Sequence, residues 1–72
     1  MIFQTRNRLY ILTDQGDGAF LIQGHPEYCP VPTPCRLIDP VEVGQCLWAN
    51  IKRPDGEFRP IHTSTVVRIV EA

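Results

Sequence analysis

Short runs of apolar residues that alternate with polar ones fill most of this 72-residue chain, and residues that favour turns separate them. Residues 8–13 (RLYILT) and 19–23 (AFLIQ) are rich in β-formers, and the Asp and Gly residues of 14–18 tolerate tight turns, which predicts a hairpin. Residues 45–52 (QCLWANIK) show the clearest alternation. There we expect Leu47, Ala49 and Ile51 on the buried face.

Proline interrupts this pattern between residues 24 and 34 (GHPEYCPVPTP), which contain four prolines. Proline fixes φ and has no amide donor, so we expect a stiff extended loop there. Beyond it, residues 35–38 are compatible with a short strand, residues 53–56 (RPDG) with a type I turn, and residues 66–70 (VVRIV) with a final β-branched strand.

Five or six short strands with frequent turn signals predict an all-β fold. We expect a single domain over residues 1–72, formed by antiparallel strands in either a small barrel or a two-sheet sandwich. A chain of this length buries only ~60% of the surface exposed by its unfolded form. A covalent cross-link, a metal ion or a partner chain would therefore be a useful source of stability beyond its small core.

The last thirty residues carry a resemblance. A long strand with Trp48 is followed by a turn at residues 54–56, a short return strand, Thr63 and Ser64, and a Val-rich strand. The order of these elements resembles that of an SH3-like barrel. The resemblance implies a single helical turn at Thr63 and Ser64. It carries over no binding residues, since this chain lacks the acidic loop and aromatic cluster of peptide-binding SH3 domains. Residues 5–7 and 63–69 also resemble short uncharacterised bacterial and phage proteins, which implies no activity.

Charge and hydropathy narrow the classes of partner. Seven basic and eight acidic residues give a net charge of −1, so we expect no general affinity for nucleic acid. The apolar runs are far too short for a membrane span or a signal peptide, which leads us to expect a cytoplasmic protein without membrane contact. An alternative is a nucleic-acid-binding barrel with a basic edge, which Asp55 and Glu57 would interrupt. The residues of this edge are Arg6, Arg8, Lys52, Arg53 and Arg59.

Histidine and cysteine suggest a second alternative, a zinc-stapled structural domain. Its ligands would be His25, Cys29, Cys35 and Cys46, but no Cys-x-x-Cys pair occurs among them. We therefore expect reduced structural cysteines and no cofactor, with Cys46 a small buried hydrophobe. No base, nucleophile and orienting group occur at a recognisable spacing, so we expect no enzyme.

These exclusions favour a non-catalytic interaction module. The proline-rich loop is conformationally restricted, so binding through it costs little further entropy. We expect its partner to be another protein or a second copy of the chain. The candidate contact residues are Tyr28, Pro30, Val31, Pro32, Pro34 and Trp48.

Overall fold

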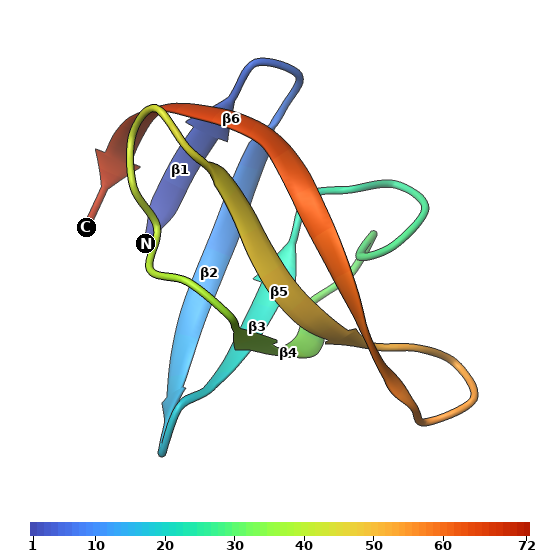
Figure 1. Ribbon diagram of the computed structural model, residues 1–72. Coiled ribbons are helices and arrows are strands. Elements are labelled where there is room, and N and C mark those ends of the chain that lie inside the picture. Colours follow the sequence, from blue (N-terminus) through green and yellow to red (C-terminus); the bar gives the residue numbers. More distant parts are fainter.

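Six antiparallel strands form a closed barrel in the computed structural model, which describes residues 1–72 (Figure 1). Each strand pairs with the next along the chain, and the last pairs with the first. The all-β prediction is confirmed, and of the two predicted architectures the structure is the barrel. No helix suitable for crossing a membrane is present. The strands are β1 (Ile2–Thr5), β2 (Leu9–Gly16), β3 (Ala19–Gln23), β4 (Thr33–Leu37), β5 (Cys46–Lys52) and β6 (Phe58–Glu71).

The barrel interior contains the apolar face of each strand. Leu47, Ala49 and Ile51 of β5 are buried, as their alternation predicts. Phe3 and Tyr10 stack inside the barrel with ring centroids 5.3 Å apart. The remaining apolar core residues are Leu12, Ile22, Cys29, Cys35 and Val66.

Strand β6 differs from the prediction. It runs without interruption through Thr63 and Ser64, so the helical turn implied by the SH3-like resemblance is wrong. The two residues instead form a bulge, because Cys46 pairs with Thr65 and Trp48 pairs with His62. The Leu47 amide donates to the Thr63 hydroxyl oxygen at 3.0 Å. The bulge bends β6, and the strand pairs with β5 along its first half and with β1 along its second.

Strand β1 and the start of β4 also differ from the sequence interpretation. Residues 2–5 form β1, which the alternation did not predict. Strand β4 starts at Thr33 and includes Pro34, although we expected the proline-rich loop to continue to residue 34. Pro34 is accommodated near the beginning of the strand, where a missing amide donor disturbs the ladder least.

Candidate functional site

The proline-rich loop between β3 and β4 is held in place by its own backbone. The Gly24 amide donates to the Cys29 carbonyl oxygen at 2.9 Å, and the Cys29 amide donates to the His25 carbonyl oxygen at 2.9 Å. Imidazole Nδ1 of His25 accepts the amides of Glu27 and Tyr28 at 3.1 and 3.3 Å. Because Cys29 is buried in the core, it anchors this closed turn against the barrel.

Tyr28 leaves the same turn toward solvent and meets the turn between β5 and β6. The Arg53 guanidinium carbon lies 5.1 Å from the centre of the Tyr28 ring, within the range of a cation–π contact. That turn is closed by the Gly56 amide, which donates to the Arg53 carbonyl oxygen at 2.8 Å. Two ordered turns from distant parts of the chain therefore face each other.

An open groove of about 450 Å³ lies between these turns. We call it the loop groove. It combines an aromatic ring, several proline rings, two cations and one carboxylate. Its lining residues are Glu27, Tyr28, Pro30, Thr33, Pro34, Lys52, Arg53 and Pro54.

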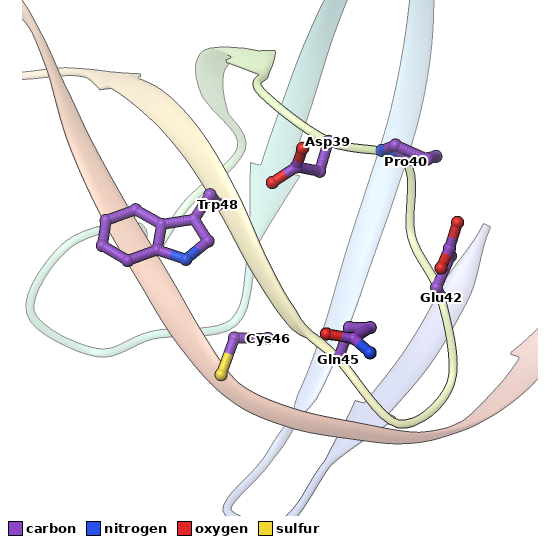
Figure 2. A pocket seen from close by; sticks show the side chains of 6 residues that line it. All are labelled: Asp39, Pro40, Glu42, Gln45, Cys46 and Trp48. Atoms are coloured by element: carbon purple, nitrogen blue, oxygen red, sulfur yellow. The ribbon is translucent and has the colours of Figure 1, made fainter.

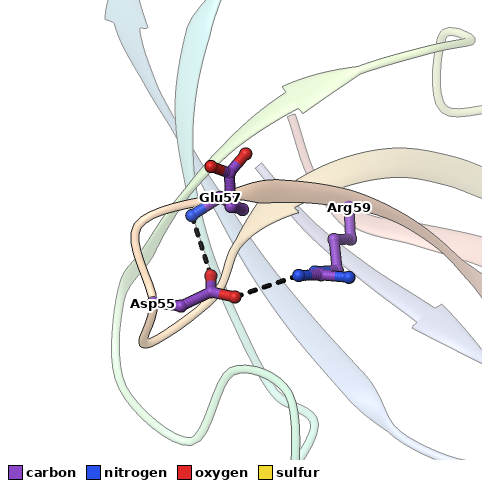
Figure 3. A network of polar contacts seen from close by, with 3 residues as sticks. All are labelled: Asp55, Glu57 and Arg59. Atoms are coloured by element: carbon purple, nitrogen blue, oxygen red, sulfur yellow. Dashed lines mark hydrogen bonds and ion pairs between the residues drawn. The ribbon is translucent and has the colours of Figure 1, made fainter.

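Arg59 does not contribute a free charge to the loop groove. Its guanidinium Nη2 lies 3.0 Å from the Asp55 carboxylate oxygen Oδ2, and this is the only ion pair in the protein (Figure 3). The second Asp55 oxygen accepts the Glu57 amide at 2.9 Å. The Glu57 amide, followed by the Arg59 guanidinium, lowers the pKa of Asp55 below its usual value.

The loop groove unites parts of two predicted residue sets. Tyr28, Pro30 and Pro34 come from the predicted protein-contact set, and Lys52 and Arg53 come from the predicted basic edge. The remaining loop residues of the contact set, Val31 and Pro32, are exposed outside the groove. No sequence pattern predicts Glu27, Thr33 or Pro54 as groove residues, since nothing in their local sequence indicates which distant turn they face.

The predicted basic edge is not continuous, which corrects the sequence interpretation. Arg6 and Arg8 occupy the turn between β1 and β2, whereas Lys52 ends β5 and Arg53 begins the turn that follows it. The two turns lie far apart on the barrel, one at the top of Figure 1 and the other at its lower right. Hairpin turns at different ends of a barrel cannot place their charges along one edge.

Trp48 lies in a second hollow of about 440 Å³ (Figure 2). Trp48 is 42% exposed, and its ring centroid lies 4.6 Å from that of His62. Cys46 lines the same hollow and is exposed, so the expectation that Cys46 is buried is wrong. Strand alternation explains the outcome, because Leu47 takes the inward position and leaves Cys46 and Trp48 facing outward.

The four predicted zinc ligands do not form one group. No set of three or more His, Cys, Asp or Glu side chains is arranged to hold a metal ion. Cys29 and Cys35 point into the core, Cys46 faces outward, and all three are free thiols. Burial raises the pKa of Cys29, and it raises the pKa of Cys35 from 9.0 to about 11.

Comparison with protein-family models, curated proteins and solved structures finds no significant match to this chain. The geometry and chemistry of the chain's own surfaces are therefore the guide to its function.

Proposed function

We propose that this protein is a non-catalytic binding module whose loop groove holds an extended, acidic segment of another protein. The observation that carries the proposal is the contact between Tyr28 and Arg53, which brings the proline-rich loop against the β5–β6 turn. The contact aligns an aromatic ring, proline rings and cations along one groove. Such a surface suits an extended peptide, whose apolar side chains contact the rings and whose carboxylates contact the cations.

The charge distribution favours an acidic partner. The only ion pair in the protein joins Arg59 and Asp55. The side-chain nitrogens of Lys52 and Arg53 therefore have no carboxylate oxygen within 4.0 Å. Glu27 is the one acidic residue of the groove. A partner carboxylate would thus gain an electrostatic interaction without breaking an existing ion pair.

The loop also favours binding on entropic grounds. Its turn is closed by backbone hydrogen bonds, and its prolines already restrict φ, so little conformational entropy is lost when a partner binds. We further place this interaction in a reducing compartment such as the cytoplasm. Three free thiols, of which Cys46 is exposed, support this placement.

Selection from a display library of short random peptides tests the proposal. We expect enriched peptides to contain acidic residues, to bind the wild-type protein, and to lose binding to the variants Tyr28→Ala and Arg53→Glu. Arg6→Glu is the matched control, because it makes the same charge change in the distant β1–β2 turn. Enriched peptides that bind Arg53→Glu as well as wild type would overturn the proposal.

Self-association is a separate outcome that native mass spectrometry distinguishes. We expect the reduced protein alone to be a monomer whose groove is open to peptide. A dimer that dissociates in the Arg53→Glu variant, but not in the Arg6→Glu variant, would identify a second copy of the chain as the occupant instead.

A further inference from the structure

The outer surface of β4, β5 and β6 carries several aromatic and basic side chains in adjacent register positions. Trp48 of β5 pairs with His62 of β6, and Lys52 pairs with Phe58 at the other end of the same ladder. Between these pairs, Asn50 is the partner of Arg36 on one side and of Pro60 on the other. We call this surface the aromatic face, and its members are Arg36, Trp48, Asn50, Lys52, Phe58, Pro60 and His62.

Strand alternation directs all of these side chains outward. Their neighbours Cys35, Leu47, Ala49 and Ile51 are buried inside the barrel, so the positions between them face solvent. Trp48 and Phe58 remain 42% and 44% exposed. Two large rings are thus left accessible on the same outer surface, opposite the buried inner residues of β5.

The charges of the aromatic face are uniformly positive. Arg36 and Lys52 belong to it, no carboxylate does, and neither cation forms an ion pair. The net charge of −1 for the whole chain conceals this distribution, because no acidic residue occupies these register positions. Asp39 and Glu42 line the hollow beside Trp48 (Figure 2), and Asp55 is paired with Arg59 in the turn beyond Phe58.

The dimensions of the face fit a short run of nucleotides. Phe58 and His62 are four residues apart on β6, which corresponds to about 13 Å at ~3.3 Å per strand residue. The Trp48 ring extends the face beyond His62, and the centroids of these two rings lie 4.6 Å apart. Rings at both ends and cations on two neighbouring strands provide stacking surfaces together with phosphate contacts.

We propose that the aromatic face binds single-stranded nucleic acid. Unpaired bases stack on Trp48, His62 and Phe58, while Arg36 and Lys52 contact the phosphates. Duplex nucleic acid does not suit the site, because its bases are already stacked and paired. The aromatic face shares Lys52 with the loop groove, but its other residues lie outside that groove, and the proposal does not depend on peptide binding there.

Titration with a single-stranded oligothymidylate tests the proposal directly, because Trp48 is the only tryptophan of the chain. We expect the nucleic acid to quench Trp48 fluorescence, and we expect duplex DNA to quench it much less. Two phosphate contacts predict a slope of about −1.4 for log K against log salt, at ~0.7 per neutralised phosphate. An oligouridylate that binds more tightly than oligothymidylate would identify RNA as the preferred form.

Matched variants locate the binding surface. Phe58→Ala should weaken binding about 5-fold or more, the lower end expected for loss of one stacked base. The double variant Arg36→Ala, Lys52→Ala should lose most of the affinity, whereas Arg6→Ala, Arg68→Ala removes the same charge from exposed positions elsewhere and should bind as wild type. Tyr28→Ala, in the loop groove, should also bind as wild type.

Two results would overturn the proposal. One is the absence of quenching by oligothymidylate at low salt. The other is an equal loss of affinity in the two double-charge variants, which would indicate nonspecific attraction by net charge. Thermal melts of each variant confirm that any loss of binding occurs in a folded barrel.

Discussion

The Arg53 guanidinium carbon lies 5.1 Å from the centre of the Tyr28 ring and links the proline-rich loop to the β5–β6 turn. Neither residue belongs to the barrel core, and Tyr28 is 37% exposed. The contact therefore orders two surface turns relative to each other without adding much to the buried core. It defines the width of the loop groove, since the groove lies between these turns.

A double-mutant cycle on this pair should give a small coupling energy. An exposed cation–π contact contributes about 0.5–1 kcal/mol to stability, so Tyr28→Ala and Arg53→Ala should each destabilise the barrel only slightly. Urea unfolding of wild type, both single variants and the double variant measures the coupling. Strictly additive effects would show that the two turns are positioned independently.

Gly24→Ala should destabilise the protein far more than Gly44→Ala. Both glycines have positive φ, at 153° and 92°. A Cβ atom at Gly24 would lie 2.5 Å from the Leu9 carbonyl oxygen and 2.8 Å from Cδ1 of Tyr10, whereas a Cβ atom at Gly44 would meet nothing within 4 Å. Thermal melting should show a modest loss for Gly44→Ala, from backbone strain of about 1–2 kcal/mol, and a larger one for Gly24→Ala. Equal losses would mean that β2 yields to the added methyl group.

Replacing Thr63 should reveal the importance of the β6 bulge. Thr63 is 4% exposed, and its hydroxyl oxygen accepts the Leu47 amide at 3.0 Å. Thr63→Val keeps the shape but removes the acceptor, so a buried amide loses its partner at a cost of about 1–3 kcal/mol. Thr63→Ser retains the hydroxyl and should preserve the Leu47 amide's protection from hydrogen exchange. Protection that survives in Thr63→Val and is lost in Thr63→Ser would show that the methyl group, not the hydroxyl, maintains the bulge.

The cysteines should differ in reactivity and in their effect on alkaline stability. Only exposed Cys46 should react rapidly with a thiol reagent in the native protein, and all three cysteines should react in denaturant. Burial raises the pKa of Cys35 from 9.0 to about 11, so the folded state holds its proton more tightly than the unfolded state. The stability that follows is fully present below pH 9 and declines as the pH rises toward 11.

Cys35→Ala should flatten this decline, and Cys46→Ala should leave it unchanged. Urea unfolding across the alkaline range measures both profiles, and their shapes are compared rather than their absolute values, because Cys35→Ala also alters core packing. Burial also raises the pKa of Cys29 and of Tyr10, so both groups leave a residual slope in Cys35→Ala. A wild-type slope in Cys35→Ala would exclude Cys35 as the source.

The local pattern of the sequence determined the all-β fold, the β2–β3 hairpin and the inner face of β5. Each depends on side chains that alternate with a period of two, or on turn residues within a few positions of one another. The same alternation placed Cys46 and Trp48 on one face of β5. The prediction that Cys46 is buried was wrong, because that face is exposed. A period of two assigns residues to faces, but whether the second face is covered depends on the rest of the fold.

Tertiary structure alone decided where the functional candidates meet. Tyr28 and Arg53 belong to different turns, and Arg36 and Asn50 to different strands, so their proximity follows from barrel closure and strand register. The continuity of β6 was decided in the same way, since the bulge at Thr63 is stabilised by a hydrogen bond to Leu47 on the neighbouring strand. Such long-range pairings leave no periodic signal in the sequence, because the contacts that stabilise them lie between segments rather than within them.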